Sequence, residues 1–298
     1  MQQFETYFNA LLVRAPAKIN LCLLVTGKRP DGFHGLRTIM AKVNWYDHLL
    51  FEKTTLPGIE LICTGPHWAP TGPENLVFRA IDLLCKQTGH TPQCKVTLTK
   101  NIPAGSGLGS ASSDAAAALL GYSRFANITV STPKLMELAA RLGSDVPFFL
   151  GSPLALCEGR GEILTPLHQI FSFTALLILP NINTSTKRVY EKYSHQKDTF
   201  ESLNSQIQLR IEQKKLDLVA KMCANMLEDS CFCLHPEIAE LKAGIEHLGI
   251  TPVCLSGSGS TLFHIIENDC SKKALNTYRS TLKDTLGCDS VIVNSNNW

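Results

Sequence analysis

Apolar and polar residues follow two different periods along this chain, and together they predict a mixture of strands and helices. The stretches expected to be strands are 11–25 (interrupted near Pro16), 36–50, 60–63, 95–99, 153–157, 162–165, 173–179, 251–255 and 289–293. The stretches expected to be helices are 74–87, the Ala-rich run from 115, 132–142, 205–227, 236–248 and 270–286. Because strands and helices mix without a regular β–α–β alternation, the pattern indicates an α+β fold in two halves.

The chain is long enough for two packed domains. It has 298 residues, of which 44% are hydrophobic and 18% charged, as is typical of a globular protein with a sizeable core. Composition shifts weakly near residues 160–170. We therefore predict an N-terminal domain over 1–165 and a C-terminal domain over 166–298.

Charge and hydropathy exclude two classes of partner. The net charge of +2 gives no electrostatic support for nucleic-acid binding. The interval 163–186 has no charged residue, but its apolar core of about ten residues is well short of the roughly 20 that span a membrane. Residues 1–13 lack a basic segment and a signal core of sufficient length, so we expect a cytoplasmic protein with no membrane partner.

Eleven cysteines are scattered along the chain. Their odd number, the absence of any Cys-x-x-Cys pair and the chain length argue against a disulfide framework and against a zinc site. We interpret them as small buried hydrophobic residues in a reducing compartment.

The segment PAGSGLGSASSD, residues 103–114, is the strongest candidate for chemistry. It follows a predicted strand and precedes an Ala-rich helix, so its glycines and serines lie at a helix N-terminus, where free N–H groups favour an anion. The segment is neither a Walker A loop, since it lacks Gly-Lys-Ser/Thr, nor a dinucleotide fingerprint, since residue 110 is Ser. It predicts a phosphate-binding loop, and the alternative is a glycine-rich turn before a capped helix.

Several other polar residues are open to structural explanations when each is taken alone. Lys18 fits a solvated residue of an edge strand. Asn75 and Asp145 fit helix caps or turn residues, and Phe33 and His34 fit ordinary residues of an exposed loop. Their combination with the glycine-rich segment is what suggests a site.

Three segments together resemble the GHMP kinase superfamily, which includes galactokinase, homoserine kinase and mevalonate kinase. They are APAKINL at 15–21, PAGSGLGSASSDAA at 103–116 and LSGSGST at 255–261. The resemblance implies a two-domain α+β fold, with an N-terminal half like domain 2 of ribosomal protein S5 and a ferredoxin-like C-terminal half. The second small-residue loop, 256–260, is then either a second anion-facing loop or a tight turn.

Finer details resemble one branch of this family. The segments AKIN, GKRPDGFH and GSDVPFF are similar to those of kinases that transfer the γ-phosphate of ATP to the 2-hydroxyl of a cytidyl methylerythritol substrate. By that resemblance Lys18 and Asp145 are the catalytic pair. A carboxylate can accept the hydroxyl proton, and an ammonium can stabilise the charge that develops in the transition state.

The same resemblance implies residues for both ligands. Phe33 and Tyr190 would sandwich the cytosine, His34 would read its edge, and Asn20 and Thr186 would add polar contacts. The residues expected to bind ATP are Asn75, Leu76 and Lys100 around the adenine, and Pro103, Ala104, Gly105, Ser106, Gly107, Leu108, Gly109, Ser110, Ala111, Ser112 and Ser113 around the phosphates.

The resemblance also implies Mg²⁺ bridging the phosphates of ATP. Ser112 or Ser113 could contact that ion, but no cluster of acidic residues identifies a protein ligand. Ser110 and Ala111 stand where the family usually has two glycines, so the loop has to close there without a positive φ.

Two other functions remain open at this point. One is a GHMP kinase that acts on another small alcohol, and the other is a nucleotide-binding regulator that no longer transfers phosphate. The aromatic and histidine pair at 33–34 favours the cytidyl substrate, and the presence of both Lys18 and Asp145 favours an enzyme.

Overall fold

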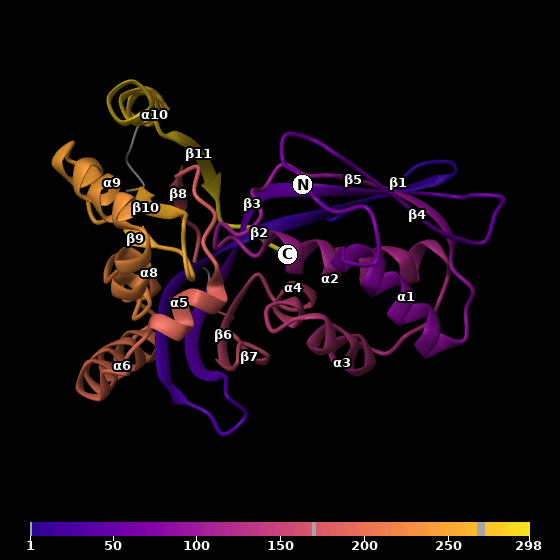
Figure 1. Ribbon diagram of the computed structural model, residues 1–298, viewed down its shortest axis with the longest axis horizontal. Helices are drawn as coiled ribbons and strands as arrows, with labels where there is room; N and C mark the ends of the chain where they lie inside the picture. The colour runs from indigo at the N-terminus through magenta and orange to yellow at the C-terminus, as the bar shows by residue number, and fades with distance from the viewer. Residues whose placement is uncertain (1, 169–170, 267–271) are drawn as a thin grey trace.

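The structure is a computed structural model that describes residues 2–168, 171–266 and 272–298. Its strands form two sheets (Figure 1). The larger has seven strands: β1 (Phe4–Thr6), β2 (Ala10–Lys28), β3 (His34–Glu52), β4 (Gly58–Thr64), β5 (Gln93–Thr99), β6 (Leu154–Gly159) and β7 (Ile163–Pro166). The smaller has four, in the order β11 (Asp289–Asn294), β8 (Thr174–Leu179), β10 (Leu262–Ile266) and β9 (Cys254–Leu255).

The strands β2 and β3 form one long antiparallel hairpin of 19 residues in each strand. The interruption expected near Pro16 is a shift of register between Pro16 and Ala17, and the strand continues through it. Such a bulge accommodates a residue that has no N–H to donate without ending the strand. In Figure 1 the hairpin curves out of the larger sheet toward α5 (Thr186–Lys192) and α6 (Lys197–Glu212).

Helices from the first half of the chain cover one face of the larger sheet (Figure 1). They are α1 (Leu76–Thr88), α2 (Ser110–Phe125), α3 (Thr132–Leu142) and α4 (Val146–Leu150). Their apolar sides form one core with the sheet, which includes Leu49, Phe51 and the alanines of α2. The sequence did not predict α4, because five residues are too few to establish a helical period.

The remaining helices pack with the smaller sheet. Besides α5 and α6 they are α7 (Leu216–Lys221), α8 (Glu228–Leu234), α9 (Pro236–His247) and α10 (Lys272–Leu286). The single helix expected over 205–227 is wrong: α6 ends at Glu212 and α7 starts at Leu216, because Lys214 between them has φ of 59°. The expected start of the last helix, at residue 270, lies outside the described residues.

A second core joins the two halves of the chain. Ile19 and Leu21 of β2 pack in the same cluster as Ile207, Val219 and Phe263 from the second half. The outer part of the β2–β3 hairpin is therefore a wall shared by both sheets. The structure confirms a mixed α and β fold in two parts, and the boundary between residues 165 and 166 stays a prediction.

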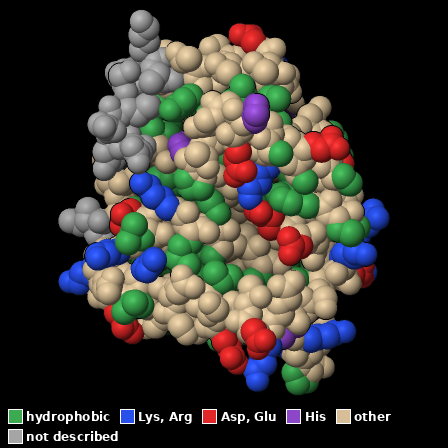
Figure 2. Space-filling model, turned by 90° about the vertical axis from the view of Figure 1, so that its left-hand side faces the viewer, with side chains coloured by type: hydrophobic (Ala, Val, Ile, Leu, Met, Phe, Trp, Pro, Cys, Tyr) green, Lys and Arg blue, Asp and Glu red, His purple; other side chains and the backbone are tan. Residues whose placement is uncertain are grey.

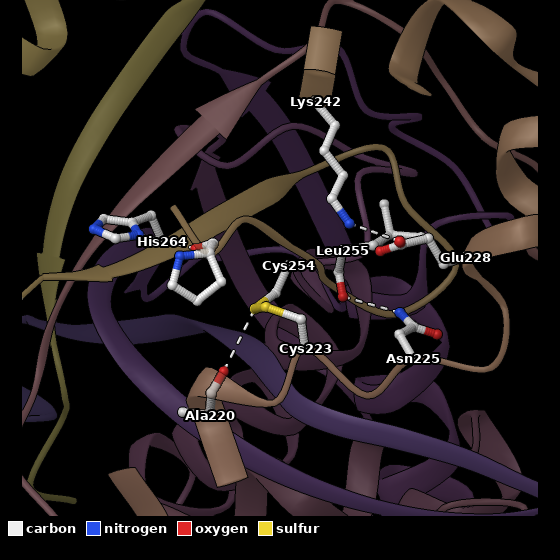
Figure 3. Close-up of a disulfide and its surroundings, with 9 residues drawn as sticks. Ala220, Cys223, Asn225, Glu228, Lys242, Cys254, Leu255 and His264 are labelled. Atoms are coloured by element: carbon white, nitrogen blue, oxygen red, sulfur yellow. Dashed lines mark hydrogen bonds and ion pairs between the residues drawn. A yellow bond between two sulfur atoms is a disulfide. The ribbon is translucent and has the colours of Figure 1, made fainter. Parts of the chain in front are cut away.

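A disulfide joins Cys223 and Cys254, 31 residues apart, so the interpretation of the cysteines as small buried hydrophobic residues is wrong for this pair (Figure 3). The spacing rules could not identify it, because the break after α7 and strand β9 bring the two residues together from distant positions. Among the free cysteines that the structure describes, most are buried, as expected of small hydrophobic residues.

Charged side chains of both signs lie on the surface. On the face shown in Figure 2, acidic and basic side chains are interspersed and no large area of one sign is visible. Within the described residues, no helix combines the length and the hydropathy needed to cross a bilayer.

Candidate active site

A cavity of about 1040 Å³ lies where the β2–β3 hairpin, the glycine-rich loop, helix α5 and the loop at 256–260 meet. It is lined by Lys18 and Asn20 of β2, by the loop around Phe33, by Asp145 before α4 and by Tyr190 of α5. Elements from both halves of the chain therefore build one site.

The glycine-rich loop forms one wall of this cavity. Gly105, Gly107 and Gly109 have φ of 66°, 79° and 70°, conformations that favour glycine, and Gly109 is the N-cap of α2. A Cβ on Gly107 would lie 2.1 Å from the carbonyl oxygen of Ser256, so only glycine fits this close approach. The predicted order of strand, glycine loop and helix is confirmed in β5, residues 103–109 and α2.

The second small-residue loop, 256–260, packs directly against the first. The Oγ of Ser256 donates to the carbonyl of Gly107 at 3.1 Å, and the N–H of Thr261 donates to that of Ser106 at 3.0 Å. Asn225 supports this second loop by donating to the carbonyls of Leu255 and Gly257 at 2.9 and 2.8 Å, next to the disulfide (Figure 3).

Lys18 and Asp145 meet in the cavity. The Nζ of Lys18 lies 3.9 Å from Oδ2 of Asp145; Lys18 is 4% exposed, whereas 31% of the Asp145 side chain is accessible. Burial lowers the pKa of Lys18, and the Asp145 carboxylate partly offsets this effect. The pair thus presents a reachable carboxylate backed by a desolvated ammonium.

Asn20 fixes the position of this ammonium. Its Oδ1 accepts from Nζ of Lys18, and its Nδ2 donates to Oγ1 of Thr38 at 2.8 Å. Thr38 in turn donates to the carbonyl of Cys22 at 2.6 Å. Asn20 was expected to contact substrate; it lines the cavity, but in this arrangement its amide holds Lys18.

The aromatic residues expected at the cytosine lie together in the cavity. The rings of His34 and Tyr190 stack at 5.3 Å with an angle of 25°, and Tyr193 meets His34 edge-on at 5.9 Å. Phe33 is 54% exposed, and the Arg160 guanidinium lies 4.9 Å above its ring. Helix α5 begins at Thr186, whose hydroxyl bonds to that of Ser258 at 2.8 Å. Tyr190, in the same helix, lines the cavity.

The three residues expected around the adenine do not line the cavity. Asn75 caps α1, accepting from the N–H of Val77 at 2.8 Å and donating to the carbonyl of Pro70 at 2.6 Å. Leu76 packs against the first core. Lys100 is 2% exposed, so its ammonium is not available to a ligand in the cavity. Contacts of these three residues with a nucleotide stay predictions.

Lys100 is instead the centre of a buried charged cluster beneath the glycine-rich loop. Its Nζ pairs with Asp47 and, at 2.7 Å, with Asp114, and it also bonds to the hydroxyl of Ser110. Burial is the largest of the causes that raise the pKa of Asp114 to about 8; repulsion from Asp47 adds to it and attraction to Lys100 opposes it. The cluster ties strand β3 to the first turn of α2, which carries the end of the loop.

Within the loop itself, the predicted residues divide into two groups. Those that line the cavity are Pro103, Gly105, Ser106, Gly107, Gly109, Ser110, Ala111 and Ser112. Those that do not are Ala104, Leu108 and Ser113. Leu108 is fully buried and its carbonyl accepts from the N–H of Lys18 at 2.9 Å, so it connects the loop to strand β2.

Several charged residues of the cavity were missed by the sequence analysis. They are Lys28, Asp31, Arg160, Lys187 and Glu191. The signal available for Arg160 was its place between Gly159 and Gly161, a charged side chain on a tight turn. Nothing in the local pattern distinguished the others from surface residues.

The donor set fits Mg²⁺ carried by nucleotide phosphates better than a resident metal centre. The residues that the structure describes contain no group of three or more His, Cys, Asp or Glu side chains that could hold a metal ion. Ser112 lines the cavity in the first turn of α2, and the buried Oγ of Ser113 has no hydrogen-bond partner. Mg²⁺ commonly takes one or two protein oxygens together with phosphates and water.

Family models match both halves of the chain. The model described as GHMP kinases N terminal domain matches residues 75–152, and the model described as GHMP kinases C terminal matches residues 209–284.

Curated relatives of known name cover nearly the whole chain. A 4-diphosphocytidyl-2-C-methyl-D-erythritol kinase from Geobacter sp. (strain M21) is 36% identical over 277 residues, which are 93% of this chain and 96% of that protein. A protein of the same name from Chloroherpeton thalassium is 37% identical over 276 residues, 91% of this chain and 94% of that protein.

Solved structures share the fold. A crystal structure of 4-(cytidine 5'-diphospho)-2C-methyl-D-erythritol kinase has a TM-score of 0.76 and 30% identity, and covers 96% of this chain and 100% of that one. Homoserine kinase from Cytophaga hutchinsonii has a TM-score of 0.75 at 19% identity, covering 100% and 98%, a likeness of fold alone.

Proposed function

Because the chain belongs to the GHMP kinase family, we propose that it transfers the γ-phosphate of ATP to the 2-hydroxyl of 4-diphosphocytidyl-2-C-methyl-D-erythritol, a step in isoprenoid precursor synthesis by the non-mevalonate pathway. The observation that carries this proposal is the meeting of Lys18 and Asp145 in a cavity whose wall is the glycine-rich loop. Relatives that act on this cytidyl substrate, by their names, support the choice of acceptor.

Asp145 orients the acceptor hydroxyl and takes its proton. Its carboxylate is accessible from the cavity, while the Lys18 ammonium behind it is not exposed to bulk water. The ammonium keeps the carboxylate ionised and stabilises negative charge on the attacking oxygen and the transferred phosphoryl group. Since phosphoryl transfer depends mainly on positioning and charge compensation, alignment of the hydroxyl is as important as removal of its proton.

The glycine-rich loop and the N-terminus of α2 hold the triphosphate. Gly105, Gly107 and Gly109 line the cavity and have no Cβ to keep a ligand away from the backbone, and the helix end adds partial positive charge. Mg²⁺ bound to the phosphates would reduce their charge, and a serine hydroxyl of α2 would supply a protein oxygen for it.

The aromatic residues of the cavity select the acceptor. Phe33, His34 and Tyr190 offer aromatic faces for a planar base, and the ring nitrogens of His34 can bond to its edge. Burial lowers the pKa of His34, which favours the neutral imidazole that can both donate and accept.

A substrate panel tests the proposal. The purified protein is incubated with Mg-ATP and, in separate reactions, the cytidyl alcohol, mevalonate and homoserine, and the products are followed by phosphorus NMR. A new phosphomonoester signal is expected only in the reaction that contains the cytidyl alcohol. Transfer to mevalonate or homoserine in its place would establish another kinase of the family, and binding of ATP without transfer to any acceptor would indicate a regulator.

A further inference from the structure

Lys42 is a buried lysine to which the proposed chemistry gives no role. It lies on β3 directly opposite Lys18 of β2, so the two side chains leave the same face of the sheet. Lys42 is 2% exposed, and the described residues place no carboxylate in an ion pair with it. Burial alone lowers the pKa of Lys42 to about 7. A cation held in this way is costly unless something else requires it.

The Lys42 ammonium is bound by the C-terminal end of helix α4. Its Nζ donates to the carbonyls of Phe149 at 3.1 Å and Gly151 at 2.8 Å, and it lies 5.8 Å from the ring centre of Phe148. The last carbonyls of a helix have no partner within the helix and carry partial negative charge. Lys42 therefore caps α4.

The opposite end of α4 is the catalytic carboxylate. Asp145 is the N-cap residue of α4, and its side chain makes no capping hydrogen bond that would fix it there. The helix has five residues, a length of about 7.5 Å at 1.5 Å per residue. In so short a helix, a shift or rotation at the Lys42 end also moves the Asp145 end.

Apolar packing alone does not fix this helix in one orientation. Phe148 and Phe149 are buried in the first core, but apolar contacts are non-directional, whereas charge-assisted hydrogen bonds specify distance and angle. Two lysines on neighbouring strands thus hold the two ends of α4, Lys18 through the Asp145 carboxylate and Lys42 through the last carbonyls.

We propose that Lys42 is a positioning residue, which fixes the separation between Asp145 and Lys18 by holding the C-terminal carbonyls of α4. The inference rests on the proposed function of that pair. A purely structural lysine would lower stability when it is replaced. Lys42 is a buried cation with no carboxylate partner in the described residues, so an apolar side chain of similar length is expected not to lower stability.

The test is Lys42→Met, which keeps the length of the side chain and removes the charge and the donors. We expect kcat to fall about tenfold or more, with KM for ATP and for the cytidyl substrate within about twofold and an unfolding midpoint in urea equal to or above that of the wild type. Lys42→Arg keeps a charge and donors and is expected to retain kcat within about threefold. Lys95 is a half-exposed lysine of the same sheet, and Lys95→Met is the matched control. It should change neither the kinetic constants nor the unfolding midpoint.

Crystal structures of the wild type and Lys42→Met give a readout that does not need activity. The separation of Nζ of Lys18 and Oδ2 of Asp145 should be near 3.9 Å in the wild type and longer in the variant. An unchanged separation, an unchanged kcat, or a loss of kcat that only parallels a loss of stability in both Lys42 variants would overturn the inference. A wild type that phosphorylates no cytidyl alcohol would refute the proposed function instead, while the separation would still decide the role of Lys42.

Discussion

The buried cluster around Lys100 gives a prediction about stability that can be worked from the structure. Lys100 lies between Asp47 and Asp114, and all three side chains are at most 4% exposed. Replacing Lys100 by Met removes the only cation of the cluster within the described residues and leaves the acidic groups of Asp47 and Asp114 facing each other in the interior without it. The substitution tests whether this cluster, rather than a nucleotide, is the partner of the Lys100 side chain.

Removing one partner of a buried ion pair typically costs about 3–5 kcal/mol, because the remaining charge is left without compensation. For a chain of 298 residues that unfolds as one unit, an unfolding entropy of about 2.1 cal/mol/K per residue converts this loss into a Tm lower by about 5–8 °C. A second substitution, Asp114→Asn, should recover part of the loss in the Lys100→Met background, since an uncharged amide replaces the second acidic group beside Asp47 and can donate to it at any pH.

The free energy of unfolding is measured in urea for the wild type, both single variants and the double variant, which together form a double-mutant cycle. Lys86→Met is the matched control: Lys86 pairs with Asp82 at 2.8 Å on the surface, with 74% of its side chain exposed, so its loss should cost under about 1 kcal/mol. A Lys100→Met variant as stable as the control, or additive effects of the Lys100 and Asp114 substitutions, would refute the reasoning.

Three further predictions follow from single residues. Burial raises the pKa of Asp114 from 3.8 in the unfolded chain to about 8, so the folded state binds the proton more tightly. The stability of the wild type therefore falls as the pH rises between these two values. The stability of Asp114→Asn relative to the wild type, measured by unfolding in urea, should increase from pH 4 to pH 8. Gly107→Ala would place a Cβ 2.1 Å from the Ser256 carbonyl and should weaken ATP binding more than tenfold by calorimetry, unlike Gly89→Ala, whose Cβ meets no atom within 4 Å. Phe33→Ala should raise KM for the cytidyl substrate about tenfold with KM for ATP unchanged, since stacking contributes about 1 kcal/mol or more; an equal rise in both constants would contradict a stacking role.

The sequence predicts those features that depend on neighbouring residues. Strands β3 and β5 follow from their apolar periods, and helix α2 follows from its run of strong helix formers. The glycine loop follows from the conformations that residues 105, 107 and 109 require. The break between α6 and α7 could not be predicted, because it depends on one residue, Lys214, adopting a positive φ.

Long-range pairing is what local patterns do not contain. Lys100 meets Asp47 across 53 positions, and Cys223 meets Cys254 across 31. In a sequence, an isolated lysine resembles an ordinary solvated residue. Neither the buried cluster nor the capping role of Lys42 could therefore be predicted without the pairing of β3 with β2. The aromatic residues were predicted by resemblance, but the stacking of His34 on Tyr190 depends on α5, a helix that the sequence pattern did not predict.

The most direct test of the central claim is a comparison of binding and single-turnover transfer in the wild type and Asp145→Asn. The amide keeps the shape of the carboxylate but neither accepts the hydroxyl proton nor carries charge. We predict that both substrates bind the variant within about threefold of the wild type, and that the rate of phosphoryl transfer falls at least about a hundredfold. Transfer by Asp145→Asn within tenfold of the wild-type rate would contradict the account.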